Sequence, residues 1–459
     1  RSTDGGASWT RTLSLDQRPS ITSIVQDTSG GKTDVWYAST GERHGNSASG
    51  GGSAFYRGNG IYKSTDGGQS WSVLPSTVSE PTQFDSVFDY TWRIRTDPSN
   101  AAEDEVYVAT SQSIVRSLDG GQSWTTVLGG GAVFPELEIT STGVVYATLS
   151  QAGANSGLYR SEDGVAWTDI TQADFPTADA KRTTIGVNPS DEDEVWFVAY
   201  APGNGPAGDQ GQGPAIDHVL WKYDAETDTS VNFSDYLPTR GDGDVSSVGG
   251  ATGDYNTQGA YDIFAKVHPD DGSKIFVGGR NLWRIDTTAA PGSADAWIGG
   301  YTETNANFAI YEPAGSDRQH PDQHALAFRP DDGSVMLTGS DGGVHRTLDN
   351  LSGGDGDVVY ESLNDGYYTT QFYEVCMNAD PSDPTFMGGM QDNGTWFTQS
   401  PDPTSDWIEQ FSGDGADCAI TIAETRPGTA RYPSAQIGQV ARFDYDENGT
   451  SLGAVFVYP

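Results

Sequence analysis

The sequence of 459 residues contains little cysteine, few basic residues and no long apolar run. Its two cysteines, Cys376 and Cys418, exclude a disulfide-dense scaffold and leave either one disulfide or two buried thiols. Because no apolar run approaches the roughly 18 residues of a membrane helix, we expect no membrane insertion. No leader peptide is visible, and the chain opens at Arg1 inside a repeat, so we expect that a leader or an earlier segment has been removed.

Basic side chains are scarce relative to acidic ones. The chain has 25 Lys and Arg against 64 Asp and Glu, which gives a net charge of −39 at pH 7. Such a surface repels phosphate backbones and anionic lipid headgroups, so nucleic acid and membrane surfaces are excluded as partners. The same charge suits cations or a saline environment.

Glycine and aromatic residues are plentiful. The 58 Gly, 12 Trp and 21 Tyr, without long stretches of strong helix formers, favour short strands joined by tight turns over helices.

One pattern, Ser-x-Asp-x-Gly-x-x-Trp, recurs along the first part of the chain, and its fourth copy is one residue shorter. Its members are Ser2, Asp4, Gly6 and Trp9; Ser64, Asp66, Gly68 and Trp71; Ser117, Asp119, Gly121 and Trp124; and Ser161, Asp163 and Trp167. Ser and Asp side chains can accept backbone N–H groups across a turn, Gly supplies a positive φ, and Trp packs on the following strand. We therefore predict a structural role for these residues.

A strand, a turn marked by Pro and a second strand precede each such turn. This larger repeat predicts an all-β fold, a β-propeller of four-stranded antiparallel blades. Eight units begin near Ile21, Trp92, Leu137, Thr183, Ile263, Ala325, Glu374 and Ala419, and residues 1–20 end an incomplete or ring-closing blade. Residues 21–459 then form either one ring of seven or eight blades or part of two tandem rings.

The repeated pattern resembles the Asp box of bacterial neuraminidase-type (BNR) repeats in extracellular proteins of the glycosyl hydrolase and sortilin-like group. Phrases such as Gln258-Gly259-Ala260-Tyr261-Asp262 and Met390-Gln391-Asp392-Asn393-Gly394 resemble a subgroup of secreted Bacteroidetes proteins. The resemblance implies a propeller at an extracellular or cell-surface location, within a larger secreted or surface assembly. It leaves function open, because this architecture hosts hydrolases, receptors and assembly factors.

Ligand-binding residues are expected in the long loops on the face opposite the Ser–Asp turns. The candidates are Glu42, Arg43, Tyr56, Asp262, Arg280, Tyr311 and Asp414. Tyrosines in these loops could stack on sugar rings or contact another protein, and they could equally fill gaps between blades.

Two groups of residues could bind a divalent cation, although no cofactor is required. His320, Asp322 and His324 alternate along an extended stretch, which suits a transition metal, with hydrogen bonding to neighbouring loops as the alternative. Asp444, Asp446 and Asn448 match the first half of a Ca²⁺ loop, with a polar turn between strands as the alternative.

Catalytic residues are harder to assign. A sialidase is disfavoured because its Arg-Ile-Pro signature is missing at Arg93-Ile94-Arg95. The chain is also similar to tandem-propeller glycosidases that cleave xyloglucan with two aspartates, and Asp341 and Asp392 stand in comparable turns, unless they only form those turns. Our main expectation is a non-catalytic propeller that binds polysaccharide or an extracellular protein; the alternative is a glycoside hydrolase that uses Asp341 and Asp392.

Overall fold

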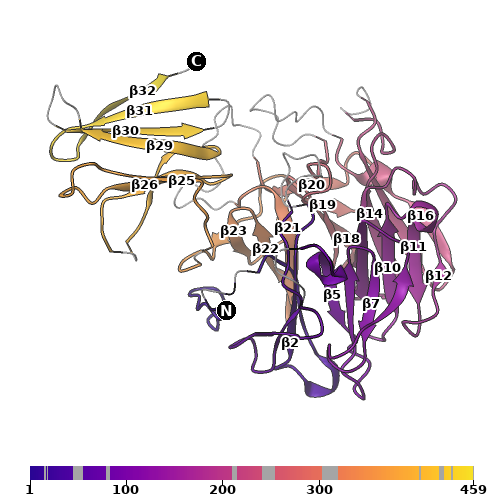
Figure 1. The fold of residues 1–459 in the computed structure, drawn as a ribbon. Coiled ribbons are helices and arrows are strands. Elements are labelled where there is room, and N and C mark those ends of the chain that lie inside the picture. Colours follow the sequence, from indigo (N-terminus) through magenta and orange to yellow (C-terminus); the bar gives the residue numbers. More distant parts are fainter. Residues whose placement is uncertain are drawn as a thin grey trace.

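The computed structural model describes residues 1–14, 17, 19–44, 55–78, 83–208, 214–239, 254–301, 319–367, 369–402, 405–422, 428–435 and 438–457. Tyr311 lies outside them. The described chain forms eight four-stranded antiparallel sheets, each with its strands in sequence order (Figure 1). The prediction of an all-β propeller with four-stranded antiparallel blades is confirmed.

We number the sheets 1 to 8 in chain order. Sheets 1 to 4 contain β1–β4 (Ile21–Gln26, Trp36–Thr40, Tyr62–Ser64, Ser72–Val73), β5–β8 (Thr91–Thr96, Val106–Thr110, Ser113–Ser117, Thr125–Gly129), β9–β12 (Phe134–Ile139, Val145–Ser150, Gly157–Ser161, Thr168–Asp169) and β13–β16 (Arg182–Val187, Glu194–Tyr200, His218–Asp224, Thr229–Asn232). Sheets 5 to 8 contain β17–β20 (Phe264–His268, Asp271–Gly278, Leu282–Asp286, Asp295–Gly299), β21–β24 (Gln323–Arg329, Asp332–Ser340, Gly343–Thr347, Glu361–Ser362), β25–β28 (Glu374–Met377, Phe386–Met390, Gly394–Thr398, Ile408–Phe411) and β29–β32 (Gly415–Ile422, Thr429–Ala435, Gln439–Tyr445, Ser451–Val457). Four short 3₁₀ helices lie between strands: η1 (Ser29–Gly31), η2 (Val87–Asp89), η3 (Gly153–Asn155) and η4 (Ser234–Tyr236).

The first strands of sheets 1 to 6 pack against one another in order, from β1 beside β5 through to β17 beside β21. Charged side chains pair between these strands: Arg93 of β5 with Glu136 of β9 at 2.5 Å, and Arg95 with Glu138 at 2.6 Å. Sheets 1 to 6 therefore stand side by side as propeller blades, with polar inner strands.

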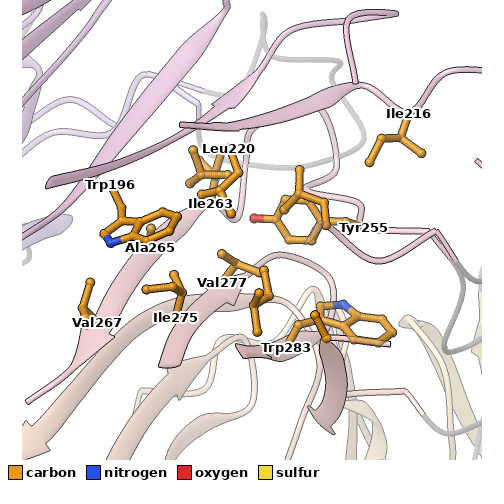
Figure 2. Packing of buried hydrophobic residues seen from close by; sticks show 14 of the residues in the cluster. Trp196, Ile216, Leu220, Tyr255, Ile263, Ala265, Val267, Ile275, Val277 and Trp283 are labelled. Atoms are coloured by element: carbon orange, nitrogen blue, oxygen red, sulfur yellow. The ribbon is translucent and has the colours of Figure 1, made fainter. Parts of the chain in front are cut away.

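Apolar side chains fill the spaces between neighbouring blades. Between sheets 4 and 5, Trp196 of β14 packs in one cluster with Val267, Ile275, Val277 and Trp283 of sheet 5 (Figure 2), and all five side chains are buried. The alternation of apolar residues along each strand places them in these layers.

The N-terminal segment packs against sheet 6. The indole Nε1 of Trp9 donates to the Leu363 carbonyl oxygen at 2.6 Å, and a Cβ added to Gly6 would lie 2.7 Å from Leu363 Cδ1. Gly121 of sheet 2 approaches Leu74, just after β4 of sheet 1, in the same manner. Residues 1–10 therefore contact sheet 6 in the same way as the turn that contains Asp119 contacts sheet 1.

Sheets 7 and 8 lie to one side of sheets 1 to 6 (Figure 1). A disulfide joins Cys376 of β25 to Cys418 of β29 across a Cα–Cα distance of 5.9 Å. The two cysteines therefore form one disulfide; the sequence had left open either one disulfide or two buried thiols. Among the described residues, no helix is long and apolar enough to span a membrane.

The four Ser–Asp turns have the hydrogen bonds that their composition allows. In the second turn, Ser64 Oγ accepts from Gly68 N at 2.9 Å and Asp66 Oδ1 accepts from Ser70 N at 2.9 Å. Ser2 with Asp4 and Ser117 with Asp119 make equivalent bonds. In the shorter fourth turn, Asp163 instead accepts from Val165 and Ala166, one residue earlier.

Candidate functional site

Acidic side chains meet where sheets 5, 6 and 7 come together. Asp322 directly precedes β21, Asp341 lies in the turn between β22 and β23, and Asp392 lies in the turn between β26 and β27. One carboxylate oxygen from each of these three residues lies within 4.8 Å of the other two. We call Asp322, Asp341 and Asp392 the carboxylate cluster.

Hydrogen bonds through the backbone fix the cluster. Asp322 N donates to the Arg280 carbonyl oxygen at 2.9 Å, and Asp341 N donates to the Asp322 carbonyl oxygen at 3.3 Å. The side-chain amide of Asn393 then donates to the Asp341 carbonyl oxygen at 3.2 Å. This series of bonds runs from the turn after β18 in sheet 5 to sheet 7.

Asp341 has a basic partner. His324 Nε2 donates to Asp341 Oδ1 at 2.7 Å. Burial by itself would raise the pKa of Asp341, but the hydrogen bond and the charge of His324 outweigh burial and hold that pKa below its usual value. Conversely, the Asp341 carboxylate raises the pKa of His324 despite its desolvation.

Asp392 has acidic neighbours. Its backbone N donates to Asp414 Oδ1 at 3.0 Å, and its carbonyl oxygen accepts from His320 Nε2 at 2.9 Å. Burial, together with the charges of Asp341 and Asp414, raises the pKa of Asp392 to about 9. One carboxylate oxygen of Asp341 and one of Asp392 lie within 4.8 Å of each other.

Asp322 and Asp262 are the most buried acids of the site, with exposed fractions of 4% and 0%. The amide of Gln258 donates to Asp322 Oδ1, whereas neither carboxyl oxygen of Asp262 has a hydrogen-bond partner among the described residues. Burial is the main cause that raises both pKa values; the charge of Asp341 raises both further, and the charge of Asp262 also raises the pKa of Asp322.

A second group of side chains adjoins the cluster. Glu42 follows β2 and exchanges two backbone hydrogen bonds with Tyr56, at 2.7 and 2.8 Å. Arg182 Nη1 donates to the carbonyl oxygens of Ala260 and Tyr261. Burial raises the pKa of Glu42, and the charge of Arg182 opposes that shift. The Tyr261 ring stands edge-on to His324 at 4.8 Å and so connects this group to the cluster.

The structure thus gathers many of the residues that the sequence singled out. Glu42, Asp262, Arg280, Asp322, His324, Asp341, Asp392 and Asp414 contribute to the region of sheets 1, 5, 6 and 7 just described. Arg43 follows Glu42 and is partly buried, and Tyr56 has an exposed fraction of 51%. Tyr255, one of the loop tyrosines, is buried and donates to the Gly278 carbonyl oxygen.

Five residues of the site were not among the candidates: His44, Arg182, Gln258, Tyr261 and Asn393. His44 is buried against Phe134 and Tyr261, and burial lowers its pKa to about 4. A signal existed for Gln258 and Tyr261, because both belong to one of the phrases that carried the family resemblance. His44 and Arg182 offered no such signal.

The two groups of residues that were expected to bind a cation lie in different parts of the structure. φ at Asp322 is +61°, which interrupts the extended conformation that its spacing with the two histidines presupposes. The ring nitrogens of His320 face the carbonyl oxygens of Pro321 and Asp392 at 2.9 Å each, and of the three only Asp322 belongs to the carboxylate cluster.

The Asp444 group lies far along the chain, in sheet 8. Asp444 pairs with Arg442 at 2.9 Å, and Asp446 Oδ1 accepts from Asn448 N and Thr450 N at 2.9 and 2.8 Å. These bonds form a turn between β31 and β32.

Known proteins add to this geometry. No family model matches the chain. Over 155 residues, 28% of this chain and 18% of the relative, the chain is 29% identical to "Xyloglucanase Xgh74A" of Acetivibrio thermocellus. The structure of an ancestral GH74 enzyme matches 99% of the chain at a TM-score of 0.62 and 15% identity. The Niastella koreensis GH74 enzyme matches 93% of the chain and 62% of its own at a TM-score of 0.40 and 14% identity.

The chain spans 58% of the ancestral GH74 enzyme, and that match shows the fold. The main expectation from the sequence, a non-catalytic binding propeller, is wrong, because the protein similar in sequence is described as a xyloglucanase and the protein similar in fold as an ancestral GH74 enzyme. The similarity favours the alternative, a glycoside hydrolase.

Proposed function

We propose that the chain belongs to a secreted glycoside hydrolase that cleaves a β-glucan of the xyloglucan class, with Asp341 and Asp392 as the reacting carboxyl groups. The observation that carries the proposal is their placement: equivalent turns of consecutive sheets bring the two groups face to face. The partial similarity to a xyloglucanase supports the substrate class.

The two groups suit the two tasks of the reaction. Glycoside hydrolysis needs one carboxyl group that protonates the leaving oxygen and one carboxylate that activates water or attacks the sugar. Asp341 accepts a hydrogen bond from His324 and is suited to the carboxylate role. Asp392 faces two other carboxyl groups, those of Asp341 and Asp414, and is suited to the acid role.

The carboxyl groups of Asp341 and Asp392 lie closer together than the two groups of a glycoside hydrolase usually do. Their nearest oxygens lie within 4.8 Å, whereas hydrolases hold the two groups about 5–5.5 Å apart for retention and about 6.5–9.5 Å apart for inversion. Asp341 belongs to sheet 6 and Asp392 to sheet 7, so movement between these sheets would separate the carboxyl groups and admit a glycosidic oxygen.

Two exposed tyrosines offer surfaces for sugar rings. Tyr56 is 51% exposed and Tyr373 is 62% exposed. Burial and the charges of Asp392 and Asp414 raise the pKa of Tyr373, with a smaller effect from Tyr56, so both tyrosines lie near the carboxyl pair. Aromatic rings of this kind combine an apolar face with a polar tip, which suits a polysaccharide.

The disulfide fits an extracellular location. The Cys376–Cys418 disulfide is typical of an oxidising compartment. The net charge of −39 also favours solubility outside the cell, where polysaccharide substrates occur.

Reducing-end release from xyloglucan, mixed-linkage β-glucan and carboxymethylcellulose tests the proposal. We expect turnover of xyloglucan by the chain, and a fall in kcat of at least about 100-fold for Asp341→Asn and for Asp392→Asn. The matched control is Asp331→Asn, because the Asp331 side chain is 77% exposed and pairs with Arg329 at the surface. Wild-type rates in both site variants would refute the assignment, and no release from any of the three glucans would refute the function.

A further inference from the structure

We infer that the carboxylate cluster of Asp322, Asp341 and Asp392 is a divalent cation site that takes Ca²⁺. The inference goes beyond the proposed hydrolase function and does not depend on it, since it requires only the positions of the carboxyl groups. A bound ion would occupy Asp341 and Asp392, so the ion-bound state and the hydrolytic state exclude each other.

The spacing of the ligand atoms fits a single ion. Ca²⁺ binds oxygen at about 2.3–2.6 Å, so two ligands of one ion lie at most about 5 Å apart. One oxygen from each member of the cluster lies within 4.8 Å of the other two. All three ligand atoms are carboxylate oxygens, which select hard cations such as Ca²⁺ over softer transition metals.

Asp262 gives an independent indication. Its side chain is fully buried, and neither oxygen has a hydrogen-bond partner among the described residues. A buried carboxyl group without a partner is costly unless a cation or a proton compensates it. Asp262 interacts electrostatically with Asp322 and Asp341, so its unsatisfied charge lies beside the cluster.

Basic groups near the site do not balance the acids. Arg280 and His324 both act on Asp262. The three carboxyl groups of the cluster and that of Asp262 outnumber these two basic side chains, so the four acids can all ionise together only with a cation among them. A divalent cation would replace the protons that otherwise compensate these buried groups.

The surroundings also orient the ligands. Gln258 donates to Asp322 and His324 donates to Asp341, so two of the three carboxylates have a second partner that fixes their rotation. Such outer hydrogen bonds are the usual support of metal ligands. Because Asp341 and Asp322 belong to sheet 6 and Asp392 to sheet 7, a bound ion would join the two sheets.

Calorimetric titration tests the site. The full chain is treated with EDTA, dialysed into about 0.15 M NaCl to screen the diffuse attraction of its acidic surface, and titrated with CaCl₂. We expect one saturable site per chain, and an affinity at least about tenfold lower in Asp322→Asn. Asp331→Asn again serves as the control, because it removes the same charge from an exposed position.

Terbium luminescence gives a second measurement. Tb³⁺ takes the same oxygen ligands as Ca²⁺, and Tyr261 beside His324 is close enough to sensitise its emission. We expect emission that excess CaCl₂ displaces and that Asp322→Asn abolishes.

If Asp322→Asn does not fold, as circular dichroism would show, Asp262→Asn decides the question. It leaves the three ligands in place and removes the neighbouring charge, so we expect weaker binding of Ca²⁺. Binding as tight in the folded site variants as in Asp331→Asn would overturn the inference, as would a titration without a saturable site. Both measurements are independent of hydrolysis, so a failed activity assay would not affect them.

Discussion

Asp341 and Asp392 lie in equivalent turns of consecutive sheets, each between the second and the third strand, and one carboxylate oxygen of each lies within 4.8 Å of the other. The repeat thus brings together two acids that are 51 positions apart in the sequence. A propeller places equivalent turns of neighbouring blades side by side, so one acidic turn per blade is enough to create a carboxyl pair.

The disulfide provides a first prediction. Replacing Cys376 and Cys418 together by Ser should lower the free energy of unfolding by about 2–4 kcal/mol, because the bridge closes a loop over a sequence separation of 42 residues. Urea unfolding of the oxidised wild type and the double variant measures the difference. The variant should also match the reduced wild type; a larger loss than reduction causes would point to packing of the sulfur atoms instead.

A second prediction concerns acid stability. Hydrogen bonds from Ser70 and Ser123 lower the pKa of Asp66 and Asp119, respectively, to about 2 from a usual value of 3.8. The folded-state pKa values are depressed, so these turns stabilise the fold above about pH 4, and this contribution is lost as the pH falls towards 2. The double variant Asp66→Asn/Asp119→Asn should therefore be less stable than the wild type at pH 7, by a margin that shrinks below pH 4.

Unfolding by urea at pH 7, 4 and 3 measures this margin. Asp331→Asn, an exposed substitution of the same kind, should have nearly the same free energy of unfolding as the wild type at all three pH values. A margin that is constant across these pH values would show that the two aspartates do not act through their charge.

The Ser–Asp turns also show which parts of the fold the sequence determines locally. Every atom that caps such a turn lies within a few residues, as when Ser64 and Asp66 accept from Gly68 and Ser70, so the sequence pattern alone predicts the turn and the blade around it. The positions of sheets 7 and 8 and the pairing of the two cysteines depend on packing between blades, for which no local pattern exists.

The candidate site, in contrast to the Ser–Asp turns, could be predicted from the sequence only in part. Asp341 and Asp392 could be proposed from the sequence because they stand in comparable turns. The sequence does not indicate that Arg182 belongs to the site, because Arg182 contacts Ala260 and Tyr261 from a strand nearly 80 positions earlier. The positive φ of Asp322 likewise follows from its place between sheets 5 and 6 and was not visible in the alternation of His320, Asp322 and His324.

A third prediction concerns the inner strands. Glu136 is 3% exposed and pairs with Arg93, so Glu136→Gln leaves a buried guanidinium without its counter-charge. We expect a loss of about 2–4 kcal/mol in the free energy of unfolding, somewhat below the full value for a buried pair because Arg93 is 21% exposed. Replacing both residues, as Arg93→Met with Glu136→Leu, should restore much of the loss. Urea unfolding of this double variant and of its two single variants, Arg93→Met and Glu136→Leu, completes the double-mutant cycle.

The last prediction concerns His324, a positioning residue that acts through Asp341. Its Nε2 holds Asp341 Oδ1 at 2.7 Å and its ring packs edge-on against Tyr261. His324→Ala should lower kcat on xyloglucan by about 10–100-fold with little change in KM, because the histidine fixes the carboxylate without itself binding the reacting atoms. His324→Gln, which can still donate a hydrogen bond, should recover part of that loss, whereas a purely structural role would predict equal thermal destabilisation and no rescue. A KM that rises while kcat stays constant would place His324 in substrate binding instead and would remove the reason for treating Asp341 as a carboxylate held by its neighbour.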